Sequence, residues 1–261
     1  MTYMEETITS AQNPKIKLLQ ELQQKSSMRR KHGLFVVEGR REVERCIQKG
    51  YRLDTVFVCP EISGSEWTGE GRVVRISPII YNKVAYRGGT EGVIAEVATQ
   101  EYRLHDLQLP NNPLVVVLES VEKPGNLGAV LRSADAAGVD AVIVCDPLCD
   151  LYHPNVIRSS TGAFFSVPCV ACRSEECIAF LKEHGIQILT AQLQDSKLYY
   201  DTDMRRGTAI IMGTESTGLT SQWREAADAH IRIPMLGITD SLNVSVSAAI
   251  LMYEAVRQRR Q

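Results

Sequence analysis

The chain has 261 residues, and 44% of them are hydrophobic, which is enough to bury a core and excludes wholesale disorder. A formal net charge of −2 and a pI near 6.2 exclude any argument for nucleic-acid binding from overall basicity. No apolar stretch approaches the ~20 residues that cross a bilayer, and the first residues lack a signal-peptide pattern. We therefore expect a soluble cytoplasmic protein that does not interact with a membrane.

The first part of the chain alternates helical and strand patterns. Helices are predicted over residues 13–24, 42–49 and 81–86, and strands over 33–38, 55–59, 72–76 and 92–97. This alternation predicts a small α/β domain over residues 1–98. Residues 99–113 are polar and contain Pro110 and Pro113, so they are predicted to be a linker.

One segment of this domain is basic although the whole chain is slightly acidic. Between Asn13 and Arg45, nine Lys or Arg residues stand against four Glu residues, a net charge of +5. The charges can belong to a solvated helical face or to a surface that follows nucleic-acid phosphates. The segment by itself does not decide between these two interpretations.

The rest of the chain, predicted as one domain over residues 114–261, again alternates strands and helices. Strands are predicted over 114–118, 141–145, 165–170, 187–191, 209–212 and 230–233, and helices near 127–137, 155–160, 175–184, 221–227 and 242–258. The strands are almost continuously apolar. That pattern is typical of a parallel sheet covered by helices on both faces.

The seven cysteines do not form an obvious framework. Their odd number and irregular spacing argue against a set of disulfides. Cys169 and Cys172 have the spacing of half a zinc site, but Cys145 and Cys149 are separated by three residues and supply no matching second half. We therefore expect reduced, partly buried thiols and no bound metal.

Three loops that follow predicted strands carry unusual residues, at the sheet edge where open parallel sheets bind ligands. The first loop, over 119–132, includes Asn126 and Arg132, and the second begins with Gly213, directly after an apolar strand, followed by Glu215. A glycine there would let a ligand approach the backbone. Each loop alone can equally be a turn with a capping residue and an exposed charge.

The third loop is the most informative. It leads from an apolar strand end through Pro234 and Gly237 into a helix of small residues. A capped helix needs one polar residue at its start, but this loop has four, which are Asp240, Ser241, Asn243 and Ser245. The surplus predicts a binding or catalytic site, with Ser245 expected to cap the helix.

Taken in order, the three loops closely resemble the motifs of the SpoU–TrmH family of RNA 2′-O-ribose methyltransferases, which belongs to the SPOUT superfamily. The matching motifs are Asn126-x-Gly128-x-x-x-Arg132, Gly213-x-Glu215-x-x-Gly218-Leu219, and Ile233-Pro-Met235 followed by Ser241-Leu-Asn243-Val-Ser245. The resemblance covers residues 114–257. A shorter segment, Phe35-Val-Val-Glu38-Gly39-Arg-Arg41, resembles the RNA-binding domain that many members carry at the N-terminus.

This resemblance implies an α/β fold with a deep trefoil knot in the C-terminal domain, which then binds S-adenosylmethionine (AdoMet). The residues implied to hold this cofactor are Ala191, Gly213, Ile233, Met235 and Leu242. The resemblance also implies a homodimer whose interface includes the C-terminal helix. The expected reaction is methyl transfer to a ribose 2′-hydroxyl.

The catalytic set implied by the resemblance is Asn126, Arg132, Glu215, Ser241 and Asn243. The family's proposed base corresponds to Arg132, yet an arginine normally stays protonated because its pKa exceeds ~12. Arg132 can therefore be a base depressed by its surroundings, or a clamp for the target phosphate while a phosphate oxygen takes the proton. The planar guanidinium favours the clamp.

The same resemblance favours RNA as the partner of the basic segment, with contacts predicted at Arg29, Arg30, Lys31, Arg40 and Arg41. Ribosomal RNA is favoured over transfer RNA because rRNA-directed members carry such an N-terminal domain. The nucleotide and any role in antibiotic resistance stay open. One alternative is a non-catalytic RNA-binding or ribosome-assembly protein on the same fold. A second, an ordinary doubly wound nucleotide enzyme, is disfavoured because the three-glycine phosphate loop is missing.

Overall fold

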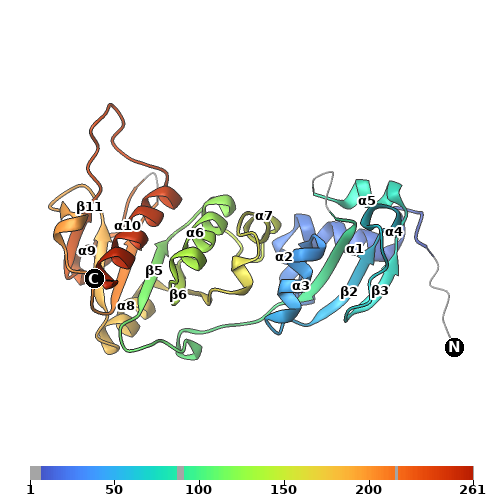
Figure 1. Ribbon diagram of the computed structural model, residues 1–261, viewed down its shortest axis with the longest axis horizontal. Coiled ribbons are helices and arrows are strands. Elements are labelled where there is room, and N and C mark those ends of the chain that lie inside the picture. Colours follow the sequence, from blue (N-terminus) through green and yellow to red (C-terminus); the bar gives the residue numbers. More distant parts are fainter. Residues whose placement is uncertain (1–6, 87–90, 215–216, 261) are drawn as a thin grey trace. The chain divides into compact units, whose positions relative to one another are not determined.

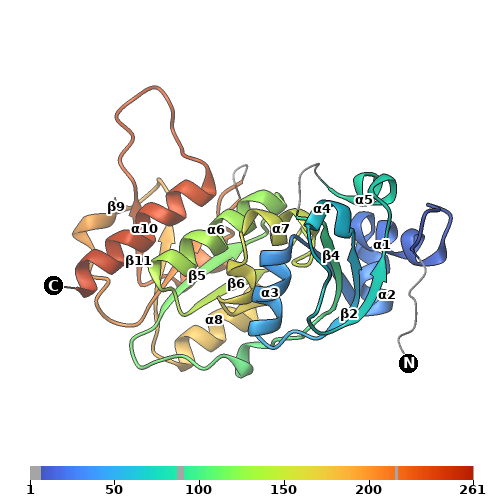
Figure 2. The same cartoon turned by 45° about the vertical axis from the view of Figure 1, so that its right-hand side comes forward.

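The structure is a computed structural model that describes residues 7–86, 91–214 and 217–260. The chain forms two compact units, which Figures 1 and 2 show with their elements labelled. The first unit contains Met1–Glu101 together with Tyr152–Arg158, and the second contains Tyr102–Leu151 and Ser159–Gln261. The boundary near residue 101 falls inside the predicted linker.

The short segment Tyr152–Arg158 corrects the prediction of two sequential domains. It lies far along the chain, yet it packs in the first unit. The ring centroids of Tyr152 and Phe35 lie 4.6 Å apart. The Tyr152 hydroxyl accepts a hydrogen bond from the backbone N–H of Gln100 at 2.9 Å. Sequence patterns describe neighbours along the chain, so they gave no indication of this contact.

The first unit is a four-stranded mixed sheet with helices. Its strands are β1 (Leu34–Glu38), β2 (Leu53–Val58), β3 (Arg72–Arg75) and β4 (Val93–Ala98), in the order β1-β4-β2-β3. Strand β4 is antiparallel to both neighbours, whereas β2 and β3 are parallel. The helices are α1 (Pro14–Gln24), α2 (Ser26–His32), α3 (Arg40–Gln48), α4 (Pro60–Ser63), α5 (Pro78–Val84) and α7 (Pro154–Ser159).

Helix α1 shows why the predicted elements form where they do. The Asn13 side chain accepts from the Lys15 N–H, and Pro14 occupies the first helical position. Ile16, Leu19 and Leu22 recur at helical spacing and are fully buried. Helix α2, which carries part of the basic segment, was not predicted because its sequence is polar and lacks that periodicity.

The second unit is a seven-stranded sheet in which every strand pairing is parallel, as predicted. The order is β7-β6-β5-β10-β8-β11-β9. The strands are β5 (Leu114–Glu119), β6 (Ala141–Cys145), β7 (Cys169–Cys172), β8 (Gln187–Ala191), β9 (Lys197–Leu198), β10 (Thr208–Met212) and β11 (Ala229–Arg232).

Helices cover both faces of this sheet. On one face, α8 (Ser174–Glu183) and α9 (Ser221–Ala226) bury Phe180 and Trp223 against inward-facing strand residues such as Val117. On the other face, α6 (Pro124–Ala137) and α10 (Val244–Arg259) pack against each other and against the sheet, as Figure 2 shows. Within the described residues, no helix has the length and apolar character needed to span a membrane.

One predicted strand is wrong. Residues 165–170 were expected to be extended, but Ala163–Phe165 form a 3-10 turn and the strand is Cys169–Cys172. Gly162 before the turn adopts a left-handed conformation with φ 90°, and the Ser160 hydroxyl accepts from the Phe164 N–H. An apolar run of this length fits a strand or a buried turn equally well.

Candidate functional site

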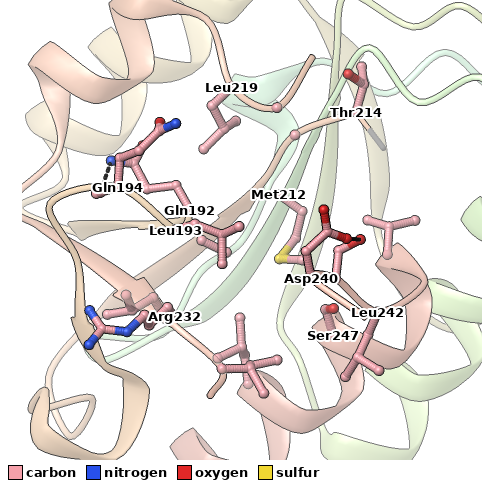
Figure 3. Close-up of a pocket in the computed structure, with 18 of the residues that line it drawn as sticks. Gln192, Leu193, Gln194, Met212, Thr214, Leu219, Arg232, Asp240, Leu242 and Ser247 are labelled. Atoms are coloured by element: carbon pink, nitrogen blue, oxygen red, sulfur yellow. Dashed lines mark hydrogen bonds between the residues drawn. The ribbon is translucent and has the colours of Figure 1, made fainter. Parts of the chain in front are cut away.

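A large pocket of about 390 Å³ opens at the carboxyl ends of β8, β10 and β11. Figure 3 shows side chains that converge on it from separate elements: Met212 from the end of β10, Arg232 from the end of β11, and Asp240, Leu242 and Ser247 from the last loop and α10. This is the edge at which parallel sheets bind ligands. Its volume lies in the usual range for small-molecule sites, roughly 300–1,000 Å³.

All five residues predicted to hold the cofactor line this large pocket: Ala191, Gly213, Ile233, Met235 and Leu242. They come from three segments that are separated along the chain. The predicted catalytic residue Ser241 lines it as well. Apolar side chains beside polar ones such as Asp240 and Gln192 suit an adenosine group, which has an apolar face and polar edges.

Gly213 has a structural role in addition to the one expected. A Cβ atom at this position would lie 2.4 Å from the carbonyl carbon of Gly218 and 2.6 Å from the Leu219 nitrogen. The second loop therefore folds back against its own start, which leaves no room for any side chain. The chain's own backbone, and not only a ligand, requires glycine here.

A small pocket of about 170 Å³ adjoins the large one. Ser120, Glu122, Lys123 and Asn126 line it, and it shares Gly213, Thr214 and Val244 with the large pocket. The two pockets thus meet at a common wall formed by the end of β10 and the start of α10. For residues 120–123 and Thr214, the only signal in the sequence is that they follow predicted strands.

The first and third loops meet directly. The Asn243 side-chain amide donates to the side-chain oxygen Oδ1 of Asn126 at 3.1 Å, across 117 positions of the sequence. This contact brings together two of the five predicted catalytic residues. Glu215, which was predicted to join them, lies outside the described residues.

The local roles of these residues differ from those expected. Helix α6 begins at Pro124, so Asn126 lies inside its first turn and does not cap it. The cap of α10 is Asn243, whose side chain accepts from both the N–H and the hydroxyl of Ser245, at 3.0 and 2.6 Å. Ser245 was expected to be the cap, and it instead holds the capping side chain in place.

Arg132 is exposed on α6 and lines neither pocket. Arg132 lies six positions after Asn126, so at about 100° per residue the two side chains leave the helix about 120° apart. Within the described part of the chain, its guanidinium has no hydrogen-bond or ion-pair partner. This exposed guanidinium is accessible to an external anion.

The second loop is tied to the sheet by a buried carboxylate. Glu119, at the end of β5, accepts hydrogen bonds from the N–H and hydroxyl of Thr220, at 2.9 and 2.6 Å. Because these bonds join segments 101 positions apart, they fix where the chain leaves the second loop. Glu119 also lines the small pocket.

The residues predicted to contact RNA divide into two groups. Arg29 is only 2% exposed, and its guanidinium donates to the carbonyl oxygens of Leu22 and Gln23, at 2.6 and 3.3 Å. It therefore joins α2 to the end of α1, and its prediction as an RNA contact is wrong. Arg30 and Lys31 on the same helix are exposed.

The other two predicted RNA contacts lie at the start of α3. Arg40 lies over the ring of Trp67, 5.5 Å from its centroid, and donates to the Ser65 hydroxyl at 3.0 Å. Arg41 is exposed, and both arginines line a shallow depression together with Ile62. They form a second cationic position on the first unit.

Comparisons with known proteins identify the family of the chain. The SpoU rRNA methylase family matches residues 113–253, more than half of the chain, and the protein belongs to this family. The MRM3-like substrate binding domain matches residues 13–95. The resemblance and the α/β fold class expected from the sequence are thereby confirmed.

Three similar proteins cover almost the whole chain. The 23S rRNA (guanosine(2553)-2′-O)-methyltransferase RlmP of Bacillus subtilis is 30% identical, over 94% of this chain and 97% of its own. A crystal structure of an RNA 2′-O ribose methyltransferase is 39% identical, with a TM-score of 0.85 and coverage of 98% and 100%. The SpoU methyltransferase AviRb from Streptomyces viridochromogenes, in complex with the cofactor AdoMet, is 28% identical, with a TM-score of 0.88 and coverage of 95% and 99%.

Proposed function

We propose that this protein transfers a methyl group from AdoMet to the 2′-hydroxyl of a ribose in ribosomal RNA. The observation that carries this proposal is the pair of adjoining pockets, which share Gly213, Thr214 and Val244 at the motif loops of the SpoU family. A methyl donor in the large pocket and a ribose in the small pocket would lie next to each other, because both would contact these shared residues. Methyl transfer requires this proximity.

The large pocket holds the cofactor, which supplies an electrophilic methyl carbon on its sulfonium when bound. Ile233, Met235 and Leu242 provide apolar surface for the adenosine, while Ala191 and Gly213 offer backbone at the strand ends. The AdoMet complex of AviRb supports this assignment. The transfer itself needs no metal ion, because the sulfonium carbon is reactive without a Lewis acid.

The remaining polar residues position the nucleotide. Asn126 lines the small pocket and is held by the Asn243 amide, and the two side chains together orient the ribose. Ser241 shapes the third loop. Arg132 grips the target phosphate, and a phosphate oxygen then accepts the proton of the 2′-hydroxyl. Glu215 is proposed to support Arg132 and the ribose.

The first unit binds the RNA around the target. The match to a substrate-binding domain supports this role, as do the exposed cations Arg30, Lys31 and Arg41. Arg40 is held by Trp67 and adds to the same surface. Since the substrate is ribosomal RNA, we place the reaction in the cytoplasm.

The active form is proposed to be a homodimer through the second unit. Leu236 and Ile238 in the third loop are almost fully exposed, as are large parts of Val246 and Tyr253 on α10. Apolar side chains gathered on one loop and one helix are typical of an interface. We also infer from the family membership that the second unit contains the trefoil knot expected for this family.

The proposal is tested by mapping ribose methylation by mass spectrometry on unmodified ribosomal RNA incubated with the protein and AdoMet. One additional 2′-O-methyl group at a defined nucleotide is the expected result. If the protein binds the RNA and AdoMet but no methyl group appears on any ribosomal RNA, it is a non-catalytic RNA-binding protein on this fold. Transfer RNA in a parallel reaction distinguishes the two substrate classes.

A further inference from the structure

Three of the seven cysteines meet in the second unit, away from both pockets. Cys145 ends β6, Cys172 ends β7, and the two are direct partners in the parallel register of these strands. Cys177 reaches them from the first turns of α8. The three sulfur atoms all lie within 4.8 Å of one another, and those of Cys145 and Cys172 are 3.9 Å apart.

These sulfur distances are close to those of a shared metal ion. Metal–sulfur bonds of about 2.3 Å place two thiolates of a tetrahedral site about 3.8 Å apart, and those of a trigonal site about 4.0 Å apart. The Cys145–Cys172 distance of 3.9 Å already matches these values, and the other two pairs, which lie within 4.8 Å, would need to shorten by at most about 1 Å. Three independent segments of the chain supply the ligands, so the fold and not the sequence spacing creates the cluster.

The surroundings favour a soft ion. Cys145 and Cys177 are fully buried among Val117, Ile143 and Trp223, whereas Cys172 is partly exposed and opens the cluster to solvent. The donor set consists of sulfur alone, which selects soft ions such as Cu⁺ and Zn²⁺ over Mg²⁺ or Ca²⁺. A trigonal Cu⁺ needs only the three thiolates, and a tetrahedral Zn²⁺ would take a water molecule at the Cys172 side.

The neighbouring polar groups are arranged as supports and not as competing ligands. The Ser174 hydroxyl donates to Asp146 at 2.6 Å and accepts from the Trp223 indole N–H at 3.1 Å. The Asp146 carboxylate also accepts from the Ser174 N–H. These bonds hold the start of α8 against the ends of β6 and β7, which fixes the position of Cys177.

We propose that Cys145, Cys172 and Cys177 bind one soft, thiophilic d¹⁰ metal ion, Zn²⁺ or Cu⁺, at the ends of β6 and β7. Binding replaces the three thiol protons, which pass to solvent. The ion then joins two strands and a helix of the second unit. This inference is independent of the proposed methyl transfer, and it departs from the expectation, based on sequence spacing, that the cysteines bind no metal.

The test uses the full-length, reduced protein after treatment with a chelator. Co²⁺ serves as an optical probe for the Zn²⁺ geometry, followed by displacement with Zn²⁺, while Cu⁺ is titrated anaerobically against a chromophoric chelator. We expect one equivalent of ion per chain and a thiolate-to-metal charge-transfer band. The relative affinities for Zn²⁺ and Cu⁺ identify which of the two ions the site prefers.

Two serine variants of β7 form a matched pair. Cys172→Ser removes a ligand at the partly exposed position, and Cys169→Ser changes a cysteine of the same strand and similar burial outside the cluster. We expect Cys172→Ser to lose the band and at least tenfold in affinity, while Cys169→Ser keeps both. A second readout is the unfolding midpoint reported by Trp223 in a Trp67→Phe background, which the ion should raise only when the cluster is intact.

Three results would overturn the proposal. The first is the absence of stoichiometric binding of either ion by the folded wild-type protein. The second is equal binding by Cys172→Ser and the wild type. The third is a loss of two hydrogen masses under non-reducing conditions with Cys145 linked to Cys172, which would make the cluster a dithiol–disulfide pair.

Discussion

The two units use their charged and apolar residues in opposite ways. In the first unit the exposed feature is cationic, with Arg30, Lys31 and Arg41 on helix surfaces. In the second unit the distinctive exposed feature is apolar, with Leu236 and Ile238 on the third loop. The difference teaches that the overall charge of −2 conceals a local separation of cationic and apolar exposed residues, which we propose to serve RNA binding and dimerisation respectively.

The tryptophans allow this comparison to be tested one unit at a time. The chain has two, and Trp67 lies in the first unit while Trp223 lies in the second. Both are buried, so the fluorescence of each should change when its unit unfolds. Single-tryptophan variants, Trp223→Phe and Trp67→Phe, therefore report the two units separately within the full chain.

The largest expected effect is on turnover, from a residue of the second unit. Arg132→Ala should lower the rate of methyl transfer by about 10²–10⁴-fold, because it removes the group proposed to hold the target phosphate. Its exposure predicts little change in the unfolding midpoint of either unit. Cofactor affinity, measured by calorimetry, should stay within a factor of two or so. Retained activity would remove Arg132 from the proposed mechanism.

The next effect concerns the pH dependence of the first unit. Glu96 on β4 is 3% exposed, and burial together with the Asp54 carboxylate raises its pKa to about 7, while Thr55 and Lys15 oppose the shift. The folded state therefore holds a proton that the unfolded state loses near pH 4.5. The contribution of this group to stability is fully present below about pH 4.5 and falls as pH rises to about 7.

Glu96→Gln should remove this dependence, because the amide has a similar shape and no charge. Relative to wild type, the variant should gain up to about 3 kcal/mol in the free energy of unfolding between pH 4.5 and pH 8, as reported by Trp67. The signal of Trp223 serves as the internal control, since Glu96 belongs to the other unit. Parallel pH profiles for the two proteins would contradict the assignment.

A pair of neighbouring arginines should sharpen the distinction between structural and RNA-binding cations. Arg29→Ala should destabilise the first unit by about 2–3 kcal/mol, because two carbonyl groups lose a charged donor. Arg30→Ala should leave stability unchanged and reduce the slope of log affinity against log salt by about 1. The measurements are Trp67-reported unfolding and RNA binding at several salt concentrations. If the two variants behave identically, the assignment of Arg29 to structure and Arg30 to RNA binding is wrong.

The smallest effect is expected from the wall of the large pocket. Gly213→Ala should destabilise the second unit by about 1–3 kcal/mol and weaken AdoMet binding, because the new methyl group meets the Gly218 backbone. Gly237→Ala is the matched control, since a Cβ there has no described atom within 4 Å. Trp223 fluorescence and calorimetry with AdoMet measure the two consequences. Equal behaviour of both variants would argue against the close approach at Gly213.

Much of the fold follows from local patterns. The strands Ala141–Cys145 and Gln187–Ala191 begin and end where the apolar runs predict, because each run is bounded by polar or glycine-containing turns. The convergence of the first and third loops was also predictable, from the rule that ligands bind at the carboxyl ends of parallel strands. Asn126 and Asn243 meet as that rule requires.

The features that were missed depend on contacts between distant segments. Whether Arg29 faces solvent or the carbonyl groups of the preceding helix depends on how α2 turns after α1, which charge patterning does not encode. The meeting of Cys145, Cys172 and Cys177 depends on strand register and on the position of α8. In both cases the sequence shows the arginine or the cysteines, but it does not show which groups they contact in the folded chain.

The return of Tyr152–Arg158 to the first unit has a consequence for how such proteins can be taken apart or recombined. A single cut at the linker would yield an N-terminal fragment that lacks Tyr152, whose ring packs on Phe35. The C-terminal fragment would keep Tyr152 without the ring that it contacts. Gene fusions that swap the specificity module of one such enzyme for another must therefore transplant two pieces of coding sequence, not one. A chimera joined only at residue 101 would combine the first 101 residues of one protein with the Tyr152–Arg158 segment of another, and the packing between them would not match.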